Sequence, residues 1–331
     1  MENPDKEVPV VENVTKELFL SEIYPARKPA ILRGIELGEA VRTWTPEYLS
    51  TTVGSRPVKV HVCPSDKMDF VKKNFAYKNL GFDELVQRAS ATGPLTEFFY
   101  SENEKYYLRA LGDDARKDCA DFAVQFPEIA NDLQLPCYFD DSQFFSSVLR
   151  LGSPGIQLWT HYDVMDNVLV QVKGSKRVVL FAPSDALHLY LSSDKSPILD
   201  PLEPDLKAYP DYAHAQRWVC TLREGEVLFM PALWSHNVLA LDFGVAVNVF
   251  WRHLDADMYE KRDPYGNKDP SVAGRALQSL DKSMQSLSAL PAEYQQFYAL
   301  RMMARLREKF CSADADGSGS SEKQESEEDG K

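Results

Sequence analysis

The sequence lacks the features of a membrane-bound or secreted protein. It contains no apolar run of membrane length, and residues 1–8 lack the basic and apolar regions of a signal peptide. The five cysteines, at positions 63, 119, 137, 220 and 311, are scattered and odd in number, and their spacing does not resemble a metal site. We therefore expect reduced thiols and a soluble protein of the cytoplasm or nucleus.

Positive charge is also scarce. The chain has 37 Lys and Arg against 50 Asp and Glu, which gives a net charge of −13. Residues 312–331 hold seven acids and two lysines without an apolar cluster, so we expect a disordered acidic tail. Without this tail the remaining chain still carries −8. Because RNA-binding proteins usually present a basic face, the global charge argues against a nucleic-acid partner.

Short apolar segments followed by turns or prolines indicate a mainly β protein with flanking helices, of the α+β class. Residues 167–173 and 176–182 are strand-like and flank a Gly-Ser turn, which predicts a hairpin. Residues 225–231 form a second apolar strand ended by proline, and residues 245–251 a further one. This pattern is typical of a double-stranded β-helix, the cupin-type jelly roll. With 331 residues and 44% hydrophobic content, the chain can bury a large core.

Two imidazoles and one carboxylate stand at equivalent strand edges. His161 and Asp163 precede the first predicted strand, and His236 follows the second segment 75 residues later. A His-x-Asp pair alone is weak evidence, but the shared strand-edge position favours a facial metal site. Two His and one carboxylate are typical of Fe(II) oxygenases, since they leave three positions open for a cosubstrate and O2. The other histidines, at positions 61, 188, 214 and 253, lack this context and are interpreted as structural.

These segments resemble a known family. Residues 161–181, 225–236 and 247–251 are similar to JmjC-type 2-oxoglutarate hydroxylases of the asparaginyl-hydroxylase-like branch, and residues 28–34 resemble that branch near its N-terminus. From about Val8 to Phe310, the chain more narrowly resembles the tRNA wybutosine-synthesizing hydroxylases. The resemblance implies an Fe(II) enzyme that uses 2-oxoglutarate and O2 as cosubstrates.

The resemblance also implies roles for residues that spacing alone leaves open. Lys176 would bind the distal carboxylate of 2-oxoglutarate, although a Lys after a Gly-Ser turn is otherwise read as solvated. Tyr107, Asn167 and Asn248 match positions that contact the cosubstrate in similar hydroxylases. Asparaginyl hydroxylases place a threonine three residues before the first His, where this chain has Leu158. Anchoring should therefore depend more on Lys176 and Tyr107.

The expected organisation has four parts. Within residues 1–136, Thr45 and Pro46 predict the start of a helix, and residues 57–62 alternate like a strand. A proline-rich loop, residues 196–205, is either a substrate lid or a surface connection. The parts are an N-terminal α/β region flanking the barrel (1–136), a JmjC jelly-roll catalytic core (137–254), a C-terminal helical dimerisation region (255–311) and the acidic tail (312–331).

Two amphipathic helices are predicted after Pro270. Apolar residues recur at helical spacing at positions 277, 280, 284 and 287, and after Pro291 at 294, 298, 302, 306 and 310. The helices could cover the barrel or pair with the same hairpin of a second subunit. The resemblance implies a homodimer through these helices.

The function implied by the resemblance is hydroxylation of a hypermodified base beside the anticodon of phenylalanine tRNA, on its amino-carboxypropyl side chain. The alternatives are a JmjC-type protein side-chain hydroxylase, which suits an acidic surface, and a non-enzymatic cupin-fold interaction protein. For RNA contact the sequence offers a basic stripe on the last helix and scattered pairs: Arg301, Arg305 and Lys309, with Arg27, Lys28, Arg33, Lys72 and Lys73. Recognition would then use shape and phosphate contacts, with one loop base extruded into the iron pocket.

Overall fold

The computed structural model describes residues 3–310, which fall into two units. The first unit extends to Pro270 and the second begins at Ser271. The expected acidic tail, residues 312–331, lies outside the described residues. None of the described helices combines the length and apolar character needed to span a bilayer.

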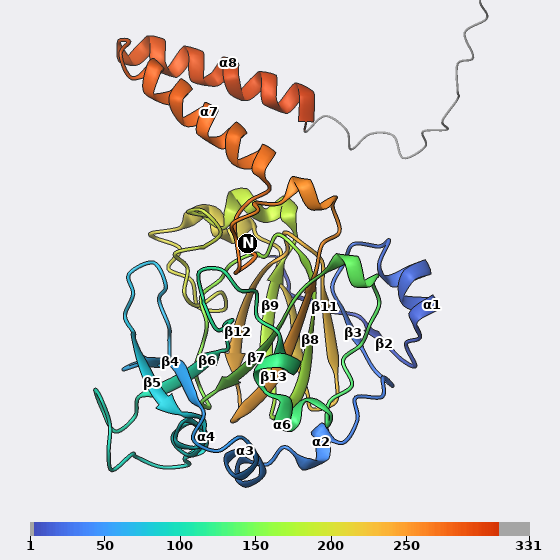
Figure 1. Cartoon of the computed structure of the whole chain (residues 1–331). Coiled ribbons are helices and arrows are strands. Elements are labelled where there is room, and N and C mark those ends of the chain that lie inside the picture. The colour runs from blue at the N-terminus through green and yellow to red at the C-terminus, as the bar shows by residue number, and fades with distance from the viewer. Residues whose placement is uncertain (1–2, 311–331) are drawn as a thin grey trace, which may run out of the picture. The chain divides into compact units, whose positions relative to one another are not determined.

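Two β-sheets form the centre of the first unit (Figure 1). The large sheet has the order β2 (Val10–Val11), β3 (Ala30–Leu32), β11 (Val227–Met230), β8 (Asp166–Lys173), β13 (Gly244–Trp251), β7 (Phe144–Gly152), β6 (Lys105–Arg109), β4 (Pro57–Cys63) and β5 (Ala76–Gly81). The small sheet has the order β1 (Lys6–Glu7), β10 (Trp218–Leu222), β9 (Lys176–Phe181) and β12 (Ser235–Ala240). The four strands predicted around the candidate ligands are confirmed, and the paired sheets fit the expected jelly roll.

The predicted hairpin between β8 and β9 is wrong. Strand β8 pairs with β11 and β13, whereas β9 pairs with β10 and β12, so the two strands lie in opposite sheets. The turn between them carries the chain from one sheet to the other. Gly174 has φ +68° there, and a Cβ would lie 2.2 Å from the carbonyl oxygen of Phe243. This close approach requires glycine.

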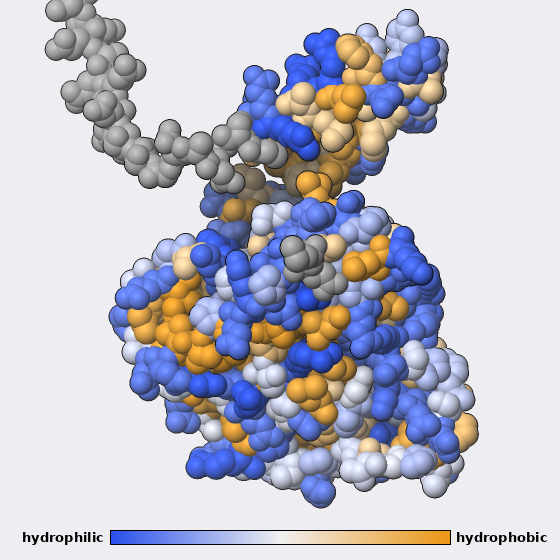
Figure 2. Space-filling model, turned by 180° about the vertical axis from the view of Figure 1, so that it is seen from behind, coloured by the Kyte–Doolittle hydropathy of each residue, from blue (hydrophilic) through white to orange (hydrophobic). Residues whose placement is uncertain are grey.

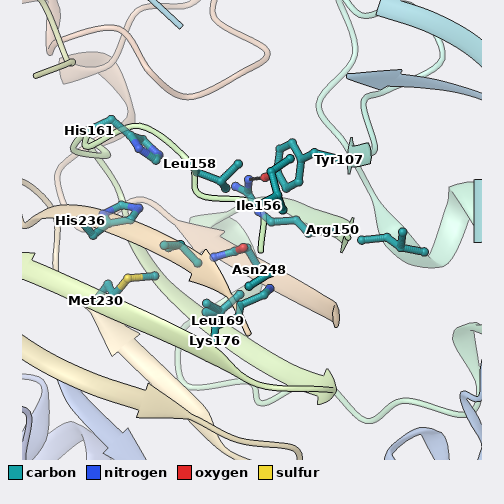
Figure 3. A pocket seen from close by; sticks show the side chains of 14 residues that line it. Tyr107, Arg150, Ile156, Leu158, His161, Leu169, Lys176, Met230, His236 and Asn248 are labelled. Carbon is teal, nitrogen blue, oxygen red and sulfur yellow. Dashed lines mark hydrogen bonds between the residues drawn. The ribbon is translucent and has the colours of Figure 1, made fainter. Parts of the chain in front are cut away.

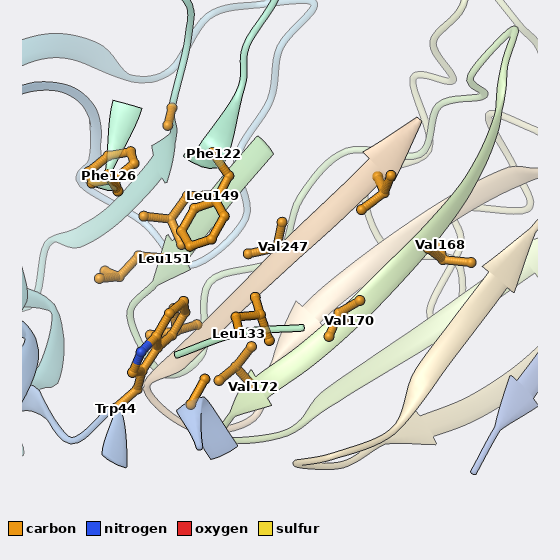
Figure 4. Packing of buried hydrophobic residues seen from close by; sticks show 14 of the residues in the cluster. Trp44, Phe122, Phe126, Leu133, Leu149, Leu151, Val168, Val170, Val172 and Val247 are labelled. Atoms are coloured by element: carbon orange, nitrogen blue, oxygen red, sulfur yellow. The ribbon is translucent and has the colours of Figure 1, made fainter. Parts of the chain in front are cut away.

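Strand β8 is buried on both faces, because the large sheet has helices on one side and the small sheet on the other. Val168 and Val170 pack with Trp44 and Phe122 in an outer cluster (Figure 4), and Leu169 points into a second cluster between the sheets. The helices of this unit are α1 (Lys16–Leu18), α2 (Ala40–Thr43), α3 (Pro46–Val53), α4 (Phe82–Ser90), α5 (Phe122–Gln125) and α6 (Pro127–Ala130), with short π or 3-10 segments η1 (Phe19–Ile23), η2 (Asp141–Gln143), η3 (Pro183–His188), η4 (Pro210–His214) and η5 (Ala256–Met258).

The N-terminal region continues the large sheet. The predicted helix start is confirmed, since the Thr45 hydroxyl accepts a 3.1 Å hydrogen bond from the Tyr48 amide at the beginning of α3. The predicted strand at residues 57–62 is confirmed as β4. Strands β4 and β6 join the sheet through β7, so their inward side chains extend the wall of the barrel beside His161.

The second unit is a hairpin of the two expected helices, α7 (Ser271–Leu287) and α8 (Ala292–Phe310). Neither helix has a buried residue, and Figure 2 shows apolar side chains at the surface of this hairpin. Leu277 and Met284 on α7, and Phe297 and Leu300 on α8, are each more than half exposed. The two helices predicted after Pro270 are therefore confirmed, and within the hairpin itself large apolar side chains remain exposed.

Candidate active site

Strand register brings His161 and His236 together. Residues 156–161 run antiparallel to β12, and the backbones of His161 and His236 exchange hydrogen bonds of 3.1 and 2.7 Å. Directly paired residues in antiparallel strands project from the same face. The two imidazole centroids are accordingly 4.4 Å apart. The pairing thus joins residues that are 75 positions apart in the sequence.

Asp163 completes a compact group of three ligands. Its Oδ2 lies 3.7 Å from Nε2 of His236, and one ligand atom from each of the three residues lies within 4.8 Å of the others. The loop before β12 is tied to the same place, because the Leu233 amide donates a 2.8 Å hydrogen bond to the Asp163 carbonyl. Leu233 has φ +69°, a strained conformation that costs about 1–3 kcal/mol and is typical of functional sites.

Both imidazoles are held in the form that binds metal. Nδ1 of His161 lies 3.0 Å from the Trp159 carbonyl, and Nδ1 of His236 lies 3.1 Å from the Trp234 carbonyl. Because a carbonyl only accepts, each Nδ1 carries the hydrogen and each Nε2 keeps a free lone pair. Burial, reinforced by His236, lowers the pKa of His161 to about 3, so the ring is neutral.

The carboxylate is held ionised. Burial opposes the charge of Asp163, but the two imidazoles and the nearby guanidiniums of Arg150 and Arg109 outweigh it, and its pKa lies below the usual value. Two imidazoles and one carboxylate at this separation fit a divalent transition metal, with iron among the ions that this donor set prefers.

A narrow inner cavity of about 40 Å³ connects the ligand histidines to Lys176 (Figure 3). Lys176 begins β9, is only 7% exposed, and forms no ion pair with a carboxylate among the described residues. Burial lowers the pKa of its ammonium to about 7, with a smaller contribution from Arg150. A buried cation without a counter-charge is costly, so this end of the cavity favours an anionic ligand.

The other residues expected at the cosubstrate are brought to the same cavity or next to it. Tyr107, on β6, and Asn248, on β13, both line it, and so does Leu158. Asn167 is not part of the lining. Its amide oxygen accepts a 3.0 Å hydrogen bond from Asn248, and its Nδ2 lies 3.5 Å from Asp163. Asn167 thus links the cavity wall to a candidate metal ligand.

Arg150 is a residue that sequence reasoning missed. It lies on β7, lines the inner cavity, and donates a hydrogen bond to the Tyr107 hydroxyl. Its Nε is buried without a hydrogen-bond partner. The available signal was a single arginine within the otherwise apolar run of residues 148–151. A charged group in a strand buried on both faces needs a polar or ligand partner.

A larger outer cavity of about 260 Å³ opens from His161 and Asp163. Its acids are Asp163 itself and Asp194, which pairs with Lys195. Its wall combines cations with aromatic rings: Lys59, Arg109, Arg150 and Lys195, with Phe70, Tyr77, Trp159 and Tyr265. Cationic groups therefore outnumber acids at the opening of the site.

Two basic residues proposed for an RNA surface are already neutralised. Arg27 forms hydrogen bonds of 2.9 and 2.5 Å to the buried Asp166 carboxylate. Arg33 contacts Glu226 at 2.7 Å and Glu12 at 3.0 Å. These guanidiniums are committed to folding contacts and are poor candidates for phosphate binding.

The fold and the candidate site together define the structural class of the protein. A double-sheet barrel with two histidines and an aspartate at one end of its cavity and a buried lysine at the other is a cupin-like architecture with a candidate metal site. Consistent with this class, residues 15–257 match the family model described as Cupin-like domain.

Relatives that align over almost the full chain narrow the class. The chain is 57% identical to tRNA wybutosine-synthesizing protein 5 of Danio rerio, over 92% of this chain and 93% of that protein. The protein of the same name from Homo sapiens is 53% identical, with 93% and 98% covered. tRNA wybutosine-synthesizing protein 4 of Gibberella zeae is 36% identical over 90% of this chain but 29% of its own length. The chain belongs to the tRNA wybutosine-synthesizing protein 5 family.

Proposed function

We propose that this protein is an Fe(II)- and 2-oxoglutarate-dependent hydroxylase that acts on phenylalanine tRNA in wybutosine biosynthesis. The observation that carries the cosubstrate assignment is Lys176, a buried ammonium without a counter-charge in the described chain, at the opposite end of a cavity from the three candidate ligands. A small dicarboxylate that chelates the metal with one end and meets the ammonium with the other satisfies both ends.

Each part of the chain has a defined task in this proposal. Nε2 of His161, Nε2 of His236 and the Asp163 carboxylate hold the iron. Lys176 binds the distal carboxylate as a charge-assisted hydrogen-bond donor, and Tyr107, oriented by Arg150, closes the same cavity. When bound there, iron would supply the O2 and 2-oxoglutarate chemistry that oxidation of an unactivated C–H bond requires.

The substrate assignment is supported by the wybutosine pathway named in the relatives and by the aromatic outer cavity. We propose that the amino-carboxypropyl side chain of the hypermodified base beside the anticodon enters this cavity. A base in a single-stranded loop can be extruded at modest cost, and Phe70 and Trp159, with ring centroids 4.4 Å apart, give an aromatic wall beside His161.

A local basic cavity offsets the acidic global charge. A cavity of about 620 Å³ lies beside the segment 256–268, whose Tyr265 also lines the outer cavity. Asp263 is one of the two acids that line this cavity, and its carboxylate accepts hydrogen bonds of 3.2 and 2.8 Å from the backbone amides of Tyr265 and Lys268. Six cations line this cavity and can meet phosphates next to the site: Arg116, Lys117, Arg252, Lys261, Arg262 and Lys268.

The exposed apolar faces of α7 and α8 support a homodimer through the C-terminal helices. The two helices do not bury these large apolar side chains against each other, and pairing with a second copy would bury them. We place the protein in the cytoplasm or nucleus, where tRNA is available.

The test is oxidation of isolated tRNA by the purified protein. We expect an iron- and 2-oxoglutarate-dependent mass gain of one oxygen on a wyosine nucleoside. The acidic surface leaves a protein side-chain hydroxylase as the alternative, and oxygen found only on protein from the same lysate would favour it. A barrel without chemistry would add oxygen to neither and form no succinate.

A further inference from the structure

Two arginines face each other across strands β6 and β7. Arg109 and Arg150 are direct cross-strand partners, an arrangement in which like charges repel. Neither forms an ion pair with a carboxylate among the described residues, and the Nε of each is buried without a hydrogen-bond partner. The pair therefore keeps unused donors and an unneutralised charge beside the candidate metal ligands.

The two guanidiniums share the outer cavity, but only one of them also reaches the inner cavity. Arg150 borders the inner and the outer cavity, whereas Arg109 borders only the outer one. Because Lys176, Tyr107 and Arg150 already surround the inner cavity, Arg109 is not needed to hold a cosubstrate there. Burial and the neighbouring Arg150 lower the pKa of Arg109 from its ordinary value, and the opposing effect of Asp163 does not outweigh them.

Arg109 is fixed in position from the outer side. Its Nη2 donates a 3.1 Å hydrogen bond to the Tyr265 carbonyl, and its guanidinium carbon lies 5.6 Å from the centroid of the Tyr265 ring. Arg109 lines the same outer cavity as His161 and Asp163. A group bound by Arg109 would therefore lie between an aromatic wall and the metal ligands.

This combination selects a carboxylate attached to a planar aromatic group. A guanidinium fork matches a carboxylate with two parallel hydrogen bonds, and the aromatic wall accommodates a base. We propose that Arg109 binds the carboxylate of the substrate's amino-carboxypropyl side chain and makes the enzyme selective for the free acid over its ester. This inference rests on the proposed tRNA function and adds the group that the site recognises.

The experiment compares two substrates and three variants. The substrates are anticodon stem-loops that carry the modified base with a free side-chain carboxylate or with its methyl ester. The variants are Arg109→Gln, Arg109→Lys, which keeps charge but loses the fork, and Lys105→Gln. Lys105→Gln is the matched control, because it removes a cation from the same strand at a position that borders neither cavity.

Wild-type protein should prefer the acid. Arg109→Gln should lower kcat/KM for the acid by about 10- to 100-fold, as expected when a charged hydrogen bond is lost, and change the ester little. The kcat/KM of Arg109→Lys for the acid should lie between those of the wild type and Arg109→Gln, and that of Lys105→Gln should match the wild type. Affinity of the metal-free proteins for the two stem-loops should show the same loss of preference. The KM for 2-oxoglutarate and its turnover without tRNA should stay unchanged in Lys105→Gln, whose side chain borders neither cavity.

Two outcomes distinguish a wrong assignment of Arg109 from a wrong tRNA function. Equal losses on acid and ester, or a preference for the acid that survives in Arg109→Gln, would overturn the assignment of Arg109 while leaving the tRNA function intact. Wild-type protein that consumes 2-oxoglutarate but oxidises neither stem-loop would instead refute the tRNA function on which the inference rests.

Discussion

The inner and outer cavities meet at the same metal ligands but differ in how they use charge. The inner cavity is narrow and places one buried ammonium, Lys176, opposite His161 and His236. The outer cavity is larger and combines several cations with aromatic rings, and the segment 256–268 contributes residues both to it and to a basic surface cavity. A small fixed ligand suits the first, and a base on a polyanion suits the second. Cosubstrate binding and substrate choice should therefore be separable by mutation.

Removing a shared ligand should disable both cavities, which is the largest effect we expect. Asp163→Ala or His236→Ala should abolish stoichiometric metal binding and measurable succinate formation, since two ligands cannot hold the ion in a facial site. Metal content and succinate are the measurements. His188→Ala is the matched control and should keep both, because His188 is not part of the ligand group. Turnover that survives in purified Asp163→Ala protein would refute the ligand assignment.

Removing the buried ammonium should damage only the inner cavity. Lys176→Met should raise the KM for 2-oxoglutarate by about 10- to 100-fold, the range expected for a lost charge-assisted hydrogen bond. Metal content and tRNA affinity should remain normal. Arg177→Met removes the adjacent charge on the same strand, from a side chain that borders neither cavity, and should behave as wild type. A normal KM in Lys176→Met would place the cosubstrate carboxylate elsewhere.

The same lysine should make cosubstrate binding depend on pH. Without ligand its pKa is about 7, so the ammonium is protonated below that value and neutral above it. Affinity for 2-oxoglutarate should therefore fall as pH rises above about 7, by at most about tenfold per unit for one proton. Calorimetry with manganese-loaded protein should also detect proton uptake on binding. The comparison with Lys176→Met is decisive, since an identical pH dependence in that variant would exclude Lys176 as its source.

Reversing charge beside the outer cavity should weaken RNA binding without affecting the inner cavity. Lys261→Glu combined with Arg262→Glu should lower tRNA affinity and reduce the salt dependence by about one to two phosphate contacts. Turnover of 2-oxoglutarate without tRNA should be unchanged. Arg301→Glu with Arg305→Glu is the parallel test for α8. If neither pair changes tRNA binding at low salt, neither surface contacts RNA.

The smallest effect on chemistry should come from the C-terminal helices. Leu277→Glu with Met284→Glu places charge on the exposed apolar face of α7 and should convert the proposed dimer into a monomer, as measured by light scattering. Uncoupled 2-oxoglutarate turnover should persist, because the candidate ligands and the inner cavity lie in the first unit. A wild-type monomer would contradict the proposed assembly.

Local patterns in the sequence predicted much of the fold but not the pairing of its strands. The local pattern located the strands at 167–173 and 245–251, as short apolar runs bounded by turns, and the helices after Pro270, as apolar residues at helical spacing. It does not report which strand lies alongside, so β8 and β9 were wrongly expected to pair. The turn between β8 and β9 is short whether the strands form a hairpin or cross between sheets. Only the packing of their apolar faces distinguishes a hairpin from a crossover.

The candidate ligands were predictable because three residue types and a shared strand edge combine into one pattern. Arg109 and Arg150 were not, since a lone arginine in a strand gives no indication of its cross-strand partner. The expectation that Arg27 and Arg33 bind RNA failed for the same reason, because the buried acids that they pair with, Asp166 and Glu226, lie more than 130 residues away in the sequence. Electrostatic partners depend on tertiary contacts that no local pattern specifies.

The central claim is that one metal site couples 2-oxoglutarate oxidation to hydroxylation of a tRNA base. The most direct measurement is turnover under isotopically labelled O2 with purified iron-loaded protein and substrate tRNA. One labelled oxygen should appear in the wyosine nucleoside and one in succinate, in equal amounts. Succinate that forms without label in the nucleoside, or a nucleoside oxygen that derives from water, would contradict the account.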